Sequence, residues 1–291
     1  MYEKIYDFQN LYNAHRRARL GKRNLSEVIA FELNLSENLI RLSDALKNQS
    51  YELSGYYSFE VFDPKRRTIH ALHYVDRVVQ HCICDEVLEP VLNPKLIYDN
   101  AACRIGKGTH FAIERVSLFL RDFYKHYGTQ GYVLKCDIRK FFDNIDHSIL
   151  KDKLRRIFRE TDLVLLLEKI IDSYETMPGK GLPLGNQTSQ WFAIYYLDEF
   201  DRFIKEKLRI KYYSRYMDDC VLIDNDKDYL RYCLKTIEEK LKGNLNLDFN
   251  TKTQIFPICN GVNYLGWHFY LTKDIFGNYL QGVAKIKNAA N

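Results

Sequence analysis

The sequence predicts an α+β fold in which helices cover one face of an antiparallel sheet. Strand-like and helix-like stretches alternate along the chain, but without the regular period of a parallel α/β protein. Apolar residues make up 46% of the 291 residues, which is enough for a sizeable core. No internal repeat, low-complexity tract or Pro/Gly-rich linker separates the elements. We therefore expect any subdomains to be folded into one compact unit.

The first third of the chain predicts two helical segments and a hairpin. Residues 26–48 carry apolar side chains mostly at helical spacing, with Ser26 as an N-cap candidate. Residues 56–63 and 68–72 have the composition of strands, and "PKRR" (64–67) lies between them. This pattern predicts a hairpin with a basic tip. A helical stripe returns over residues 75–88.

The remaining elements follow from the same periodicities. The middle of the chain predicts helices over 109–126, 147–158, 162–174 and 188–208, a strand over 132–138 and a glycine-rich loop over 178–186. Two strands then flank Asp218 and Asp219. A helix over 227–242 and short strands to about residue 271 complete the pattern.

Composition excludes several classes of protein. No apolar stretch approaches the length needed to span a bilayer, and the first residues do not have the pattern of a signal peptide. We therefore expect a cytoplasmic protein with no membrane partner. The seven cysteines are odd in number and include no CxxC pair, so we interpret them as reduced core residues rather than a zinc site.

The charge distribution is compatible with nucleic-acid binding without requiring it. The net charge is only +5, but basic clusters occur at 15–23, 64–67 and 153–156, and the chain has 22 tyrosines. Cations among aromatic rings suit a chain that holds phosphates and stacks bases. A solvated surface rich in Lys and Arg is the alternative.

Two adjacent acids, Asp218 and Asp219, lie between strand-like runs in "YSRYMDDCVL". A tight turn is the simple explanation, because Asp favours turns. However, the predicted strand "YVLKCDI" (132–138) also ends near an acid, and alternation places Lys135 and Asp137 on one of its faces. If the two strands are neighbours, three carboxylates converge, and divalent cations would make that tolerable. Two Mg²⁺ ions held in this way form the clamp of polymerases and nucleases, which the spacing alone does not distinguish.

Longer blocks around these acids resemble a known family. "YMDD", "LKCDIRKFFDNIDH" (134–147) and "GLPLGNQTSQWFAIYYLDEFD" (181–201) resemble the bacterial reverse transcriptases. Four further blocks occur in the family's order: "PKRRTIHALHYVDRVVQH" (64–81), "YDNAACRIGKGTHFAI" (98–113), "LNLDFNTKTQIF" (245–256) and "GVNYLGWHF" (261–269). The resemblance covers roughly residues 25–270.

This resemblance implies a right-hand polymerase fold with fingers and palm. Residues 1–130 would form N-terminal helices and fingers, residues 131–271 the palm, and the two together one reverse transcriptase domain. Residues 272–291 would be a short tail or thumb remnant, so the thumb is expected to be minimal, absent or truncated. The expected substrates are an RNA template, a DNA or RNA primer and dNTPs. A partner protein, a structured non-coding RNA or self-association would compensate for the short thumb.

The resemblance also assigns roles to individual residues. Asp137, Asp218 and Asp219 would hold two Mg²⁺ ions, for which Mn²⁺ can substitute, with help from the Ile138 carbonyl. Phe142 matches the steric gate against a ribose 2′-hydroxyl, with a core aromatic as the alternative.

Further positions match the binding of nucleotide and primer. Arg67 would grip the triphosphate, a task that Lys65 or Arg66 could share, unless these residues only form a solvated turn. The remaining assignments are nucleotide contacts by Leu184 and Gly185, a Lys252 that protonates pyrophosphate or is merely solvated, and a primer grip formed by Tyr264, Leu265 and Gly266.

The glycine-rich loop narrows the class within the family. Leu184 and Gln190 occupy positions where retroviral and many group II intron enzymes carry Gln and Pro. "LGNQTSQ" instead resembles the enzymes of diversity-generating retroelements, which are error-prone. An antiviral-defence enzyme that copies a partner non-coding RNA is the alternative; retron enzymes match less well. An inactive RNA-binding protein and a nuclease are the other classes considered.

Overall fold

The computed structural model describes residues 1–62, 66–273 and 279–285. It divides into two compact units, and the chain alternates between them. Unit 1 comprises Met1–Lys95 and Phe142–Tyr196, and unit 2 comprises Leu96–Phe141 and Leu197–Asn291. These units are defined by packing alone, so the functional boundaries at residues 130 and 271 stay a prediction.

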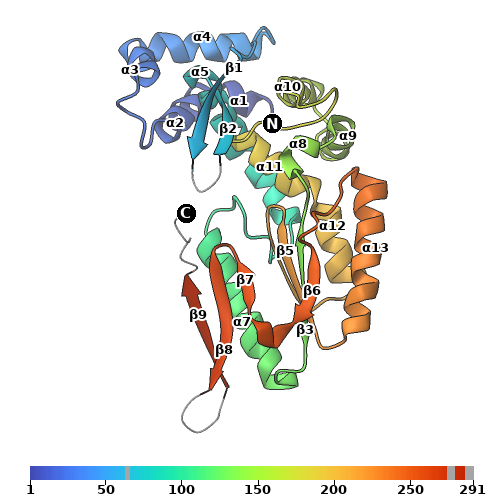
Figure 1. The fold of residues 1–291 in the computed structure, drawn as a ribbon. Coiled ribbons are helices and arrows are strands. Elements are labelled where there is room, and N and C mark those ends of the chain that lie inside the picture. The colour runs from blue at the N-terminus through green and yellow to red at the C-terminus, as the bar shows by residue number, and fades with distance from the viewer. Residues whose placement is uncertain (63–65, 274–278, 286–291) are drawn as a thin grey trace. The chain divides into compact units, whose positions relative to one another are not determined.

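Unit 1 consists of helices and one hairpin (Figure 1). The hairpin strands β1 and β2 pair in antiparallel fashion from Tyr56↔Leu72 to Phe62↔Arg66, as the sequence predicts. The first half of the "PKRR" tip, Pro64 and Lys65, lies outside the described residues. The elements are α1 (Glu3–Tyr6), α2 (Phe8–Ala18), α3 (Ser26–Leu33), α4 (Leu35–Lys47), β1 (Tyr56–Phe62), β2 (Arg66–Leu72), α5 (Tyr74–Ile83), α6 (Glu89–Leu92), α9 (His147–Ile157), α10 (Thr161–Asp172) and α11 (Gln187–Tyr196), with α8 (Phe141–Asn144) at the junction of the units.

Three predicted helices differ from the structure in detail. The segment 26–48 is two helices, because Asn34 leaves the helical conformation with φ −126° and ψ 43°. Ser26 is the first residue of α3 rather than its cap, and Leu25 occupies the cap position without a side-chain bond. The helix predicted over 75–88 passes from α5 into a π-helical turn, Cys84–Leu88. The helix predicted over 188–208 is interrupted at Leu197.

Unit 2 contains the predicted antiparallel sheet, with strand order β4-β5-β3-β6. The helix α13 lies against β3, β5 and β6 (Figure 1). The helix α7 lies against the edge strand β4. The predicted α+β class is therefore confirmed. The elements are α7 (Thr109–Tyr127), β3 (Tyr132–Asp137), α12 (Asp198–Arg202), a π-helical turn (Phe203–Lys207), β4 (Tyr212–Tyr216), β5 (Asp219–Asp224), α13 (Lys227–Leu245) and β6 (Gln254–Pro257).

A second antiparallel sheet completes unit 2. It has the order β7-β8-β9 and consists of Val262–Tyr264, Trp267–Lys273 and Tyr279–Lys285. Apolar side chains of α7, β3–β5 and the β7–β8 hairpin form one buried cluster that joins the two sheets. β9 falls within the segment predicted as a tail or thumb remnant, of which residues 274–278 and 286–291 lie outside the described residues.

No helix within the described residues combines the length and the apolar character needed to cross a membrane.

Candidate active site

Strand pairing brings the predicted acids to one end of the larger sheet. β3 and β5 are neighbours, and their register places Asp137 directly opposite Asp219. Residues 217 and 218 form the tight turn that joins β4 to β5, and the Ile138 amide donates a hydrogen bond to the Asp218 carbonyl at 3.4 Å. The convergence inferred from sequence therefore arises from the backbone ladder itself.

A buried side-chain network supports the turn that carries Asp218. Met217 has a left-handed backbone, with φ 53°, which is uncommon for a residue with a side chain. The Arg215 guanidinium donates through Nη1 to the Met217 carbonyl at 2.8 Å. Its Nε and Nη2 atoms each donate to Asp201 at 2.6 Å, and both side chains are fully buried. The turn is thus attached to α12 through a charged group that has no access to solvent.

Mutual repulsion and burial make the acid pair electrostatically costly without a cation. The pKa of Asp218 is raised to about 6. Burial is the largest cause, its own backbone and Arg215 oppose the shift, and the neighbouring Asp219 and Asp137 carboxylates add to it. Burial also raises the pKa of Asp219. Lys135 opposes this shift in pKa, and Asp137 adds to it. The Lys135 ammonium lies 3.4 Å from the Asp219 carboxylate. This ion pair gives the Asp219 carboxylate a counter-charge within unit 2.

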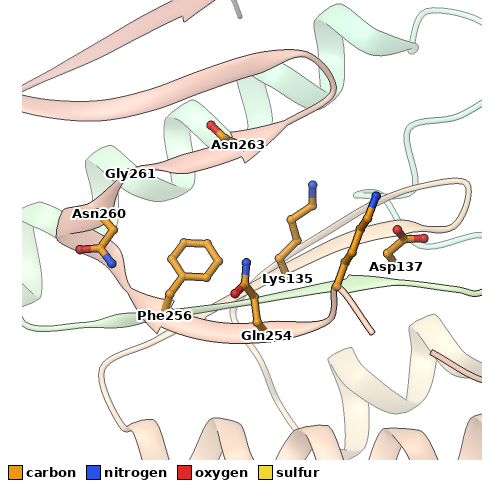
Figure 2. Close-up of a pocket in the computed structure, with 8 residues that line it drawn as sticks. Lys135, Asp137, Gln254, Phe256, Asn260, Gly261 and Asn263 are labelled. Carbon is orange, nitrogen blue, oxygen red and sulfur yellow. The ribbon is translucent and has the colours of Figure 1, made fainter. Parts of the chain in front are cut away.

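A polar cleft of about 620 Å³ opens beside these strands. Lys135 and Asp137 project into it from β3, and Gln254 and Phe256 lie beside them on β6 (Figure 2). The cleft is also lined by Lys252, Asn260, Gly261 and Asn263. Asp218 and Asp219 are not among the lining residues, so the cleft reaches only one of the three acids.

The donor chemistry of this site fits hard divalent cations. Carboxylate and backbone carbonyl oxygens are the ligands that Mg²⁺ and Mn²⁺ take in proteins. Across the described residues, however, no three His, Cys, Asp or Glu side chains are close enough together to hold a metal ion as they stand. Asp219 would have to exchange its ion pair with Lys135 for a metal ion.

The predicted primer-grip residues form a tight hairpin turn. Tyr264 ends β7 and is paired with Trp267 of β8, while Leu265 and Gly266 have φ values of 49° and 78°. Two successive left-handed residues match the twist of a two-residue hairpin. Tyr264 is 1% exposed and belongs to the buried cluster, so its side chain supports the turn rather than lining its surface.

The other predicted nucleotide contacts lie in unit 1. Arg67 is exposed on β2. Its neighbour Arg66 lies on the opposite face of the strand and forms an ion pair with Glu60 at 2.5 Å. Phe142 is partly exposed, whereas its neighbour Phe141 is 3% exposed. The core aromatic of this pair is therefore Phe141.

The glycine-rich loop carries Leu184 and Gly185. Gly185 has φ 103°, a region that other residues rarely adopt. A Cβ atom added there would lie 3.4 Å from Ile69 of β2, so the loop passes close to the hairpin. Thr188 donates a hydrogen bond to the Gln80 side chain of α5 at 2.9 Å, which fixes the start of α11.

The structure thus groups the predicted site residues in two sets. Unit 2 holds the three acids, Ile138, Lys252 and the primer-grip turn, and unit 1 holds Arg67, Phe142, Leu184 and Gly185. Sequence reasoning missed the roles of Arg215 and Asp201. The available signal was a charged residue inside the otherwise apolar and aromatic run "YYSRYM".

The fold and the paired acids define the class of nucleic-acid polymerases. Residues 62–269 match the family described as reverse transcriptase (RNA-dependent DNA polymerase), so the chain belongs to this family of RNA-directed DNA polymerases. Enzymes of this family act on RNA templates with primers and dNTPs and use divalent metal ions. The predicted reverse transcriptase family and enzyme class are confirmed, whereas the closer likeness to enzymes of diversity-generating retroelements stays a prediction.

The chain is similar to a bacterial protein in sequence and to telomerases in fold. Protein YkfC of Escherichia coli K12 is 25% identical over 275 residues, which cover 77% of this chain and 71% of YkfC; this agrees with a bacterial type. Telomerase from Candida albicans, solved in complex with a TWJ fragment of telomeric RNA, aligns with a TM-score of 0.55 at 15% identity over 76% of this chain. C-terminally truncated apo telomerase from Candida tropicalis aligns with a TM-score of 0.52 at 15% identity over 85% of this chain.

The telomerase alignments cover only part of each telomerase chain. This chain spans 46% and 60% of those two telomerase chains. At such identities the likeness concerns the fold alone.

Proposed function

We propose that this chain synthesises cDNA on a bacterial RNA template, with Asp137, Asp218 and Asp219 as the ligands of two Mg²⁺ ions. The observation that carries this proposal is the register of β3 and β5, which pairs Asp137 with Asp219 beside the Asp218 turn. When bound, the two ions would activate the primer 3′-hydroxyl and stabilise the charge that develops on the transferred phosphate.

Basic residues of the cleft would assist the acids. Lys135 neutralises Asp219 at 3.4 Å, and this ion pair keeps the carboxylate ionised until a metal replaces the ammonium group. Lys252 is exposed and lines the same cleft as Asp137. From there it would donate a proton to the departing pyrophosphate. The Ile138 carbonyl would add an oxygen ligand next to Asp137.

Unit 1 would supply nucleotide selection. Arg67, exposed on β2, would bind the triphosphate through its planar guanidinium group. Phe142, the partly exposed member of the Phe pair, would exclude a ribose 2′-hydroxyl. Gly185 would let the loop backbone approach the nucleotide, and Leu184 would contact the base pair.

Primer extension on an RNA template with Mg²⁺ and dNTPs tests the proposal. Asp218→Asn should lower the rate by at least ~10³-fold, equivalent to about 4 kcal/mol of transition-state stabilisation. Asp228→Asn removes one acid from an exposed site on α13 of the same unit and should leave the rate unchanged. Near-normal synthesis by Asp218→Asn, with both variants equally folded, would contradict the metal assignment.

We further propose error-prone synthesis in a diversity-generating retroelement, because Leu184 offers the base pair only apolar contact. Such contact discriminates by roughly 1–3 kcal/mol, whereas a Gln can penalise a misplaced pair by leaving polar groups unpaired. Leu184→Gln should therefore lower the error rate on an adenine-rich RNA template, as measured by sequencing the cDNA. Equal error spectra would remove this role and favour the alternative, a defence enzyme that copies a partner non-coding RNA.

The proposed enzyme would work with a partner, which is a second protein, a structured RNA or another copy of the chain. Each would extend the grip on template and primer. Copurification of RNA or protein with the full chain, analysed with and without nuclease, separates these partners.

A further inference from the structure

A second polar cleft, of about 590 Å³, lies along α7 in unit 2. Five of its lining residues are basic and two are acidic, which leaves a formal charge of +3 on this one surface, against +5 for the whole chain. We call this surface the α7 basic face; its cations are Arg115, Arg121, Lys125, Lys205 and Lys211. It shares no lining residue with the cleft that contains Asp137.

The α7 basic face lies at the far end of β4 from the candidate active site. Lys211 and Tyr212 belong to the face and stand where β4 begins, whereas Tyr216 ends the strand just before the turn that carries Asp218. A strand rises about 3.3 Å per residue, so this separation is roughly 15 Å. A ligand on the face would therefore be bound outside the reaction centre.

The two acids hold three of the five cations in place and leave the face with a net positive charge. Asp99 is buried and lies 2.7 Å from Arg115 and 3.1 Å from Lys205. Asp122 accepts hydrogen bonds from Lys211 at 2.8 Å and from the Tyr212 hydroxyl at 2.7 Å. These bonds lower the pKa of Asp122 to about 2. Cations held by neighbours lose little conformational freedom when an anion binds.

Aromatic rings extend the face toward the start of α7. The Tyr98 side chain is 63% exposed, with the Lys107 ammonium 4.4 Å and the Arg115 guanidinium 5.2 Å from its ring centre. Arg115 also lies 4.7 Å from the ring of Phe119. Alternating cations and rings are typical of surfaces that bind nucleic acids.

Lys107 lies among other cations at this end of the face. Burial is the main cause that lowers the pKa of Lys107 to about 8, repulsion by Arg104 and Arg115 contributes, and Asp99 opposes the shift. A bound phosphate would relieve this repulsion. Arg115 and Lys125 are ten positions apart on α7, or about 15 Å at 1.5 Å per residue, which is the length of several nucleotides rather than of one phosphate.

We propose that the α7 basic face binds the phosphodiester backbone of a folded RNA outside the polymerase cleft. The α7 helix presents Arg115, Arg121 and Lys125 along one cleft, an arrangement suited to the phosphates that border the wide minor groove of an A-form helix. This function goes beyond template copying, because the RNA held here need not be the strand being read. The polymerase would thus carry a structured RNA while it copies a template.

Fluorescence anisotropy of a closed RNA stem-loop tests the proposal with the full chain. The probe has about 16 base pairs and no single-stranded end, so it cannot serve as template and primer. Arg121→Gln/Lys125→Gln/Lys211→Gln should weaken binding at least ~10-fold and reduce the slope of log K against log salt by about 2–3, since each lost phosphate contact removes about 0.9. Extension of oligo(dT) on poly(A) should stay within about twofold of the wild type.

A matched triple variant on α13 controls for the loss of charge. Arg231→Gln/Lys235→Gln/Lys242→Gln removes three exposed cations from the same unit and should leave stem-loop binding unchanged. Equal losses in both triple variants, or no loss in either, would overturn the proposal. Equal binding of a DNA stem-loop of the same sequence would overturn the assignment to RNA.

Two further measurements keep the test decisive. If the triple variant unfolds, Lys125→Glu reverses one exposed charge and should still weaken stem-loop binding by more than about fivefold; an unchanged affinity would overturn the proposal. Failure of the proposed polymerase function would appear separately, as a wild-type chain that binds the stem-loop but makes no cDNA.

Discussion

Replacing Asp201 by asparagine should lower the free energy of unfolding by about 3–5 kcal/mol, because it leaves the Arg215 guanidinium buried without its counter-charge. Neither side chain of this pair is exposed, and two of the guanidinium nitrogens donate to Asp201 at 2.6 Å. The Tyr213 hydroxyl donates to the same carboxylate at 2.5 Å. No water can replace these bonds when the negative charge is removed.

An exposed pair of the same length isolates the effect of burial. Arg231 and Asp228 on α13 are also 2.6 Å apart, but their side chains are 61% and 85% exposed. Pairs of this kind contribute about 0–1 kcal/mol, since water screens both charges. Arg231→Gln should therefore shift the urea midpoint little, whereas Asp201→Asn should shift it strongly. Equal midpoints for the two variants would refute the reasoning.

A double variant separates the stability of the pair from its effect on the active-site turn. Asp201→Leu/Arg215→Met replaces the pair by apolar groups, which is often neutral or stabilising in other proteins. We expect most of the unfolding free energy to return. DNA synthesis should stay low, because the Arg215 hydrogen bond to the Met217 carbonyl is lost with the guanidinium. Full recovery of synthesis would show that the turn does not need this bond.

Two further predictions concern unit 1. Phe142→Ala should raise ribonucleotide incorporation by one to two orders of magnitude, on the roughly 1–3 kcal/mol scale of pocket discrimination, as measured by competition between rNTP and dNTP; unchanged sugar choice would return Phe142 to a packing role. Burial, followed by Lys22, Arg17 and Arg77, lowers the pKa of His81 to about 4. The neutral imidazole therefore stabilises the fold above its unfolded pKa of about 6.5, and up to about 3 kcal/mol is lost as the pH falls from 6.5 to 4. His81→Gln should reduce the dependence of the urea midpoint on pH between 6.5 and 4, relative to the wild type. Parallel curves of midpoint against pH for the two proteins would contradict the assigned pKa.

The sequence predicts backbone features of the site better than side-chain networks. The end of β3 at Asp137 and the Asp218 turn could be inferred, because strand alternation and turn preference are local properties. The break at Asn34 and the interruption at Leu197 could not, because the apolar spacing continues through both positions. The Arg215–Asp201 pair could not either, since it joins a strand to a helix that lies elsewhere in the sequence.

The difference between backbone positions and side-chain contacts also explains the state of the three acids. They are aligned, but their side chains are not close enough together to form a metal site. Their backbone positions follow from the β3–β5 ladder and the Met217 turn. Their side chains, by contrast, respond to charge, and Asp219 is directed toward Lys135. A divalent cation offers the three carboxylates more attraction than one ammonium group can, because its charge is larger and it accepts several oxygen ligands. Under the proposed assignment, metal binding would need side-chain rotation at these backbone positions. Lys135, once displaced from Asp219, would remain on the same face of β3 as Asp137, where it would meet the phosphates of an incoming nucleotide.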